Sequence, residues 1–186
     1  QPIGNWDVSN ISNMTSMFYG ASSFNQPLEN WDVSNVINMS NMFNGATSFN
    51  QPLENWDVGA VQDFNAMFEG ATSFNKSIGN WNVSSADNLR RMFNGATSFN
   101  QDIGSWDVLG VDKMWWMFRD ATSFNQDLSN WDVSTVDNMQ KMFEGATSFN
   151  QDLSEWSVMN VTSCGEFNDN TPEWTLPKPN FTNCTP

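Results

Sequence analysis

The sequence predicts an α/β solenoid in which each 25-residue repeat contributes one short parallel strand plus one short helix or 3-10 segment. Two observations predict this class. The amino-acid sequence repeats with a constant period, which is typical of solenoids and other repeat arrays. Each repeat also carries apolar residues that a single unit cannot bury, whereas stacked units bury them in a continuous core.

Six full repeats begin at tryptophans 25 positions apart, and a degenerate repeat follows them. They start at Trp6, Trp31, Trp56, Trp81, Trp106 and Trp131, with the degenerate repeat at Trp156. Residues 1–5 match the end of a repeat, so the predicted solenoid domain covers residues 1–163. Residues 164–186 leave the pattern and are predicted to form a C-terminal cap, because repeat arrays need covered ends.

The second repeat shows the elements expected in every unit. Residues 28–33 indicate a short extended stretch, and such stretches are expected to pair in parallel about 4.8 Å apart. The apolar spacing over residues 36–46 predicts one face of a short helix. Asp32 or Ser34 is expected to cap its N-terminus, and Gly45 lies where a C-cap glycine belongs.

Both cysteines of the chain lie in the predicted cap, at Cys164 and Cys184. A pair confined to one terminal segment indicates a disulfide, which persists in oxidising compartments. Closing a loop of this length would contribute about 3 kcal/mol. Trp174 and Phe181 are the expected apolar plugs beneath it. The first repeat has no equivalent cap, so its open face is expected to meet either upstream repeats or another subunit.

The repeats carry a resemblance to a known family. Their signature, WDVSNV-x-NM-x-x-MF-x-GATSFNQ-x-L, resembles the 25-residue repeat of BspA-like surface proteins, a repeat that also occurs in mycoplasma-type surface lipoproteins. The resemblance implies a leucine-rich-repeat-like, right-handed coil that is exposed on the cell and used for adhesion. It does not imply a particular ligand. Asn82, Ala86, Leu109 and Gly110 depart from the signature.

Composition excludes several function classes. The 21 acidic and 7 basic residues give a net charge of −14, which repels phosphate backbones and argues against a nucleic-acid partner. No apolar run is long enough to insert in a membrane. The chain has no His and a single Tyr, Tyr19, and its acidic residues are regular copies without a reason for divergent pKa values. We therefore expect neither an enzyme nor a cofactor.

One pair of adjacent positions varies from repeat to repeat while its apolar neighbours do not. The pairs are Thr15–Ser16, Ser40–Asn41, Asn65–Ala66, Arg90–Arg91, Trp115–Trp116 and Gln140–Lys141. Five of the seven basic residues fall in the same three repeats, namely Arg90, Arg91, Lys113, Arg119 and Lys141. Tryptophan beside arginine is typical of interaction hot spots. The sequence therefore predicts a partner-binding face at Trp115, Trp116, Arg90, Arg91, Arg119 and Lys141. The alternative is that one Trp packs on its own repeat and the basic residues only offset acidity.

Two columns of polar residues have structural and functional interpretations. An aspartate follows the leading tryptophan of most repeats, at Asp7, Asp32, Asp57, Asp107 and Asp132. Helix capping would explain these carboxylates, and calcium at Asp32, Asp57, Asp107 and Asp132 is the alternative. An asparagine column, at Asn25, Asn50, Asn75, Asn100, Asn125 and Asn150, is expected to satisfy backbone groups at a bend. Among several glycosylation sequons, Asn180 in the cap is the best candidate.

Two functions remain open at the level of sequence. The first is a non-enzymatic extracellular or cell-surface protein that adheres to a protein or glycan ligand through an exposed face of the solenoid. The second is a structural building block, in which copies stack end to end into a fibre or a surface stalk.

Overall fold

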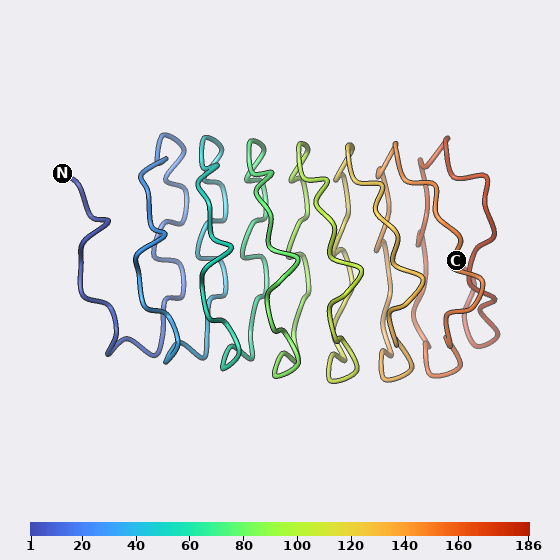
Figure 1. Cartoon of the computed structure of the whole chain (residues 1–186). Coiled ribbons are helices and arrows are strands. Elements are labelled where there is room, and N and C mark those ends of the chain that lie inside the picture. The colour runs from blue at the N-terminus through green and yellow to red at the C-terminus, as the bar shows by residue number, and fades with distance from the viewer.

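The computed structural model describes all residues, 1–186. The 25-residue repeats form coils that stack side by side along one axis, with the N-terminus at one end of the stack and the C-terminal segment at the other (Figure 1). There is no helix, and no strand is longer than one bridged residue. Parallel bridges join one position of each coil, namely Asn13, Asn38, Asp63, Asn88, Lys113, Asn138 and Ser163.

Backbone hydrogen bonds between coils lie on both sides of these bridges, and most of them lie on the C-terminal side. In the second coil, the N–H of Asn41 donates to the carbonyl of Asn65 at 2.8 Å, and the N–H of Phe43 donates to that of Met67 at 2.9 Å. The expected pairing of residues 28–33 was therefore wrong in its place, because the paired segment comes later in the repeat. The wider prediction of a right-handed, leucine-rich-repeat-like coil stays a prediction.

The helix expected at residues 36–46 is replaced by consecutive turns. The N–H of Met42 donates to the carbonyl of Met39 at 3.1 Å, that of Asn44 to Asn41 at 3.2 Å, and that of Ala46 to Phe43 at 3.0 Å. Within the first of these turns, Asn41 has a φ of 57°, a left-handed conformation that interrupts a right-handed helix. Consecutive turns place apolar residues three positions apart, as a helix does. The spacing of apolar residues in the sequence therefore could not distinguish a helix from a chain of turns.

The glycine at the end of these turns has the backbone that was expected, without a helix to cap. Gly45 has a φ of 72°, which costs glycine little because it lacks a Cβ atom. Gly20, Gly70, Gly95 and Gly145 are left-handed in the same way, and in the fifth full repeat Asp120 takes this conformation at 54°.

A single cluster of 54 buried residues fills the interior of the stack. Its centre consists of aromatic columns, in which the rings of Phe43 and Phe68 lie 5.5 Å apart and those of Phe43 and Phe49 lie 4.1 Å apart. Aromatic pairs at these distances contribute about 0.5–1.5 kcal/mol beyond burial. Each buried tryptophan also links coils, because the indole N–H of Trp56 donates to the carbonyl of Leu28 at 3.0 Å.

The asparagine column forms a ladder along the stack. The side-chain oxygen of Asn75 accepts the backbone N–H of Asn100 at 3.0 Å and the amide of Gln101 at 2.8 Å. The same bond recurs from Asn25 onward, and in the last coil Asn150 accepts the N–H of Thr175 at 2.9 Å. These amides satisfy backbone donors at the bend of each coil.

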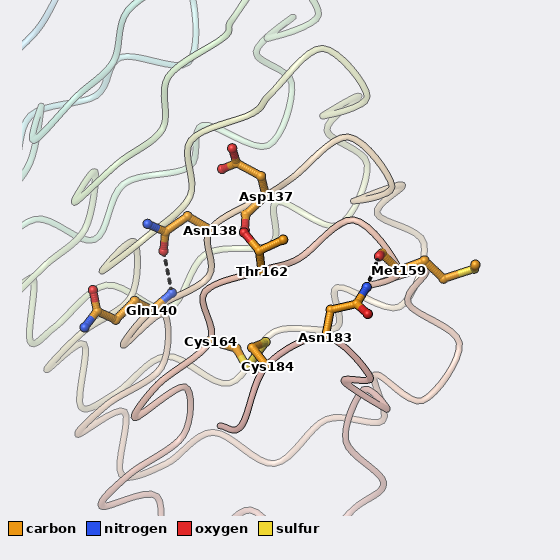
Figure 2. The surroundings of a disulfide bond; sticks show 8 residues. All are labelled: Asp137, Asn138, Gln140, Met159, Thr162, Cys164, Asn183 and Cys184. Carbon is orange, nitrogen blue, oxygen red and sulfur yellow. Dashed lines mark hydrogen bonds between the residues drawn. A yellow bond between two sulfur atoms is a disulfide. The ribbon is translucent and has the colours of Figure 1, made fainter.

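The C-terminal segment folds back over the last coil (Figure 1). A disulfide joins Cys164 to Cys184, and close by the side chain of Asn183 donates to the carbonyl of Met159 at 2.6 Å (Figure 2). Trp174 packs edge-on against Phe149 at 4.7 Å and so ends the aromatic columns. No helix of the chain has the length and apolar character that crossing a bilayer requires.

Candidate functional site

The variable pairs occupy one position of successive coils, and we call this surface the variable strip. It comprises Thr15–Ser16, Ser40–Asn41, Asn65–Ala66, Arg90–Arg91, Trp115–Trp116 and Gln140–Lys141. The two members of each pair lie two and three residues after the bridged residue of their coil. In the second and third coils one member is buried, Ser40 at 7% and Ala66 at 2% exposure. From the Arg90–Arg91 pair onward, both members are half-buried.

The second member of every pair has a left-handed backbone, although none is glycine. The residues are Ser16, Asn41, Ala66, Arg91, Trp116 and Lys141, with Glu166 at the same position of the degenerate repeat, and their φ values lie between 53° and 65°. This conformation costs a residue with a Cβ atom about 1–2 kcal/mol. The second left-handed position of each repeat, that of Gly45 and its equivalents, holds glycine in most repeats. The strip instead carries side chains at a position where glycine would remove the backbone strain.

Arginines stack on both tryptophans of the strip. The guanidinium carbon of Arg90 lies 5.1 Å from the ring centroid of Trp115. Trp116 is contacted by two guanidinium groups, that of Arg91 at 4.1 Å and that of Arg119 at 5.0 Å. Cation–π contacts of this kind contribute about 0.5–2 kcal/mol and fix the orientation of both partners. The structure thus brings together five of the six residues predicted to bind a partner.

Lys141, the sixth predicted residue, joins the strip through ion pairs. Its ammonium group lies 2.8 Å from Glu166 and 3.5 Å from Glu144. The hydrogen bond to Glu166 is the main reason that the pKa of Lys141 is raised above its ordinary value. Arg119 also pairs with Glu144, at 2.7 Å.

Most cations in the strip and next to it, which include Lys113 and Arg119, form ion pairs, and one does not. Arg91 lies 3.8 Å from Glu69, and Lys113 lies 3.1 Å from Asp112, whose hydrogen bond raises the pKa of Lys113. Arg90 has no carboxylate within 4 Å, and its Nε donates instead to the side-chain oxygen of Asn65 at 2.9 Å. The guanidinium fork of Arg90 is therefore held in place without a charged partner.

Two donors of the strip are buried without an acceptor. They are the indole N–H of Trp116 and the Nε–H of Arg91. Arg91 stacks over the ring of Trp116, and an N–H facing an aromatic ring gains a weak interaction there. The indole N–H of Trp116 has no such compensation, and a buried donor without an acceptor costs about 1–3 kcal/mol.

The aspartate column stabilises turns instead of capping helices. Asp32 accepts the backbone N–H of Ser34 at 3.1 Å and its hydroxyl at 2.6 Å. These bonds, the hydroxyl bond first, lower the pKa of Asp32 below its ordinary value. Asn82 accepts the same two donors from Ser84, at 3.1 Å and 2.8 Å. A negative charge is therefore not essential at this position.

The structure adds no support for calcium binding or for glycosylation. No three carboxylate, cysteine or histidine side chains lie close enough together to hold a metal ion, so Asp32, Asp57, Asp107 and Asp132 do not form a cluster. Asn180 is exposed in the cap, and its glycosylation stays a prediction. The one cavity of the molecule is at the cap and is lined by Thr147, Asn168, Asn170, Thr171 and Pro172, none of which belongs to the strip.

The carboxylates of the strip were missed at the level of sequence, although a signal was present. Glu144 lies 25 residues after Arg119, and Glu166 lies 25 residues after Lys141. Opposite charges one repeat apart occupy neighbouring coils, so the repeat length alone would have paired them. The indole hydrogen bonds of the tryptophan column had no such signal, because an apolar column is expected for tryptophan in any case.

Comparison with known proteins identifies one family. The family described as "Mycoplasma protein of unknown function, DUF285" matches residues 1–98 and 76–177. These matches are consistent with a mycoplasma-type repeat family and do not single out the BspA-like proteins. No curated protein and no solved structure shows significant similarity to the chain.

Proposed function

The chain belongs to the DUF285 family of Mycoplasma repeat proteins, and we propose that it is a non-enzymatic surface protein that binds a partner through the variable strip. The family and the Cys164–Cys184 disulfide support an extracellular location. Adhesion of the BspA-like kind is the finer form of the same proposal, and it rests on the resemblance of the repeats.

The observation that carries the proposal is the left-handed backbone of the strip. Across the repeats the second position holds residues as different as Ser16, Ala66, Arg91 and Trp116, all with a positive φ. A purely structural role would favour glycine there, as it does at Gly45 and its equivalents. Strained non-glycine residues are typical of functional sites, so retained and varied side chains support recognition.

The fifth full repeat is the expected centre of the binding face. Trp115 and Trp116 are half-buried, and stacked arginines hold their rings in place. Preorganised tryptophan and arginine side chains lose little conformational entropy on binding, which is why they dominate the energetics of interfaces.

The test is a screen of immobilised glycans and host surface proteins against the intact protein and its Trp115→Ala and Trp116→Ala variants. Trp6→Ala is the matched control, because Trp6 is 54% exposed and lies in the first coil. We expect a ligand whose binding is lost in both strip variants and kept in the control. Equal binding by all four proteins would refute the proposal, provided that their circular dichroism spectra agree.

A second candidate, end-to-end stacking, is favoured by unpaired backbone groups at the two ends of the stack. The carbonyls of Asn13, Thr15 and Met17 accept no backbone N–H, whereas the N–H groups of Glu166 and Asn168 donate to none. The unpaired carbonyls are two residues apart, and so are the unpaired N–H groups, which is the spacing of the backbone bonds between coils. In end-to-end stacking, the last coil of a second copy would present its donors to these carbonyls of the first coil.

Light scattering over a wide range of protein concentration tests stacking of copies. Tyr19 is 63% exposed on the first coil, and Tyr19→Lys adds a charge that such a junction would bury. Stacking predicts a mass that grows with concentration and a Tyr19→Lys variant that stays monomeric. A monomer at every concentration would exclude this candidate and leave the binding proposal untouched.

A further inference from the structure

We propose that Arg90 and Trp115 form a subsite for the carboxylate group of an acidic saccharide. This inference rests on the proposed function and names the chemistry of the ligand at its centre. Two features of the variable strip support it: an arginine without a carboxylate within 4 Å, and the fixed orientation of that arginine over a tryptophan.

The first feature is the charge balance of the strip. Arg91, Arg119 and Lys141 each face a glutamate, at 3.8, 2.7 and 2.8 Å, and Lys113 faces Asp112. Among these five cations, Arg90 alone has no carboxylate within 4 Å. A guanidinium fork without a partner matches a carboxylate in shape and charge, and such two-point pairs are among the strongest polar contacts in proteins.

The second feature is the fixed geometry of this arginine. Its Nε donates to the side-chain oxygen of Asn65, and its guanidinium carbon lies over the indole ring of Trp115, 5.1 Å from the centroid. Only the terminal nitrogens of Arg90 remain to meet a ligand. Because both side chains are already oriented, binding would cost little rotamer entropy.

A carboxylate is the complement that these terminal nitrogens lack. The N–H groups of the Arg90 guanidinium are donors only, and a carboxylate is a pure acceptor with two oxygens. The unpaired donors of Arg91 and Trp116 are buried, so a ligand at the surface does not reach them and they take no part in the subsite.

The class of ligand follows from charge and shape. With a net charge of −14, the protein repels polyanions, so a single carboxylate is favoured over a phosphate chain or a nucleic acid. No cavity opens at the strip to receive an apolar peptide side chain. Amide side chains lie in the strip at Asn65, two coils before Trp115, and at Gln140, one coil after it, and amides hydrogen-bond sugar hydroxyls. A saccharide fits this surface better than a peptide does.

The experiment compares two sugars that differ by one carboxylate. Methyl glucuronide and methyl glucoside are titrated into the nitrogen-15-labelled protein, and the indole N–H signals are followed by NMR. We expect the glucuronide to shift the signals of Trp115 and Trp116, which single Trp→Phe variants assign. The glucoside should bind at least about tenfold more weakly, which is the contribution of one charge-assisted pair.

The Arg90→Gln variant tests the role of the guanidinium. It should weaken glucuronide binding by a factor of about ten or more and leave the weak glucoside binding unchanged. Lys76→Gln is the control, because it changes the net charge equally outside the strip. Arg90→Lys should restore only part of the affinity, since an ammonium keeps the charge without the fork.

Each other outcome counts against the inference. Equal binding of the two sugars, or no effect of Arg90→Gln, would remove the carboxylate subsite. Binding of a peptide through its terminal carboxylate, with no binding of the glucuronide, would overturn the saccharide class. If the screen yields a neutral ligand that needs Trp116 but not Arg90, the proposed function stands and this inference fails. If strip variants bind every partner normally, the proposed function itself fails.

Discussion

The asparagine ladder makes a sharp prediction about what holds the coils together. At Asn75, one side-chain oxygen accepts two donors from the next coil, the N–H of Asn100 and the amide of Gln101. The side-chain nitrogen of Asn75 makes no protein hydrogen bond of its own. Only the acceptor should therefore matter, and an acceptor of the same shape should replace it.

The expected loss in the Asn75→Ala variant follows from these two bonds. The half-buried N–H of Asn100 loses its only acceptor, which costs about 1–2 kcal/mol, and the amide of Gln101 turns to water at about 0.5 kcal/mol. The sum of about 2 kcal/mol lowers the midpoint of thermal unfolding by about 4–8 °C for a chain of this size. The Asn75→Asp variant keeps both bonds and should stay within about 1 kcal/mol of the parent protein.

Two measurements check the ladder. Urea unfolding, followed by tryptophan fluorescence, gives the free energy of unfolding, and hydrogen exchange reports the amide of Asn100 directly. Exchange is needed because repeat arrays can unfold in parts. Fast exchange at Asn100 is expected in Asn75→Ala and not in Asn75→Asp. Equal losses in both variants, or an unchanged amide in Asn75→Ala, would refute the assignment of the bond.

Three further predictions concern single columns and the cap. Hydrogen bonds from Ser34 lower the folded-state pKa of Asp32 below its ordinary value of 3.8. The stability that they provide is therefore present above pH 3.8 and is lost as the pH falls through the lower folded value. The unfolding free energy of Asp32→Asn, measured between pH 5 and 2, should change less with pH than that of the parent. Gly95→Ala should destabilise the fold by about 1–2 kcal/mol because its backbone is left-handed. Gly145→Ala should destabilise it more, because the added methyl group would also contact the carboxylate of Asp120. A double-mutant cycle of urea midpoints should show that this excess vanishes in an Asp120→Gly background. Cys164→Ser should destabilise the fold by about 3 kcal/mol, because the disulfide closes a loop of 20 residues. Hydrogen exchange should locate this loss of stability in the last coil. Unfolding of the whole stack would contradict the view that the disulfide fixes only the cap.

The repeat length could be predicted from sequence because it depends on side chains that must recur. Phe43 and Phe49 pack on their own copies in the next coil, so each repeat needs them at the same place. The asparagine column could be predicted for the same reason. The turns could not, because an apolar spacing of three satisfies a helix and a chain of turns equally. The conformation that decides between them, at Asn41, belongs to a residue type that tolerates both.

The candidate site could be located from sequence but not described. Variation between repeats revealed the pairs that include Trp115 and Trp116, because a position that changes in every copy is not fixed by packing. The left-handed backbone at Trp116 was beyond prediction, since a bulky residue in that conformation is an outlier on local grounds. The lone charge of Arg90 became visible only when the distances separated it from the paired cations.

The same backbone bonds explain how the strip can vary while the fold does not. The N–H of Arg91 donates to the carbonyl of Trp115 at 3.2 Å, and that of Trp116 donates to the carbonyl of Gln140 at 3.0 Å. These bonds use main-chain atoms alone, so they form with any side chain that accepts the left-handed conformation. The tryptophan and asparagine columns, by contrast, bond through their side chains and cannot change freely. Recognition can therefore differ from coil to coil along the strip, because the backbone bonds that join its coils do not depend on the identity of its side chains.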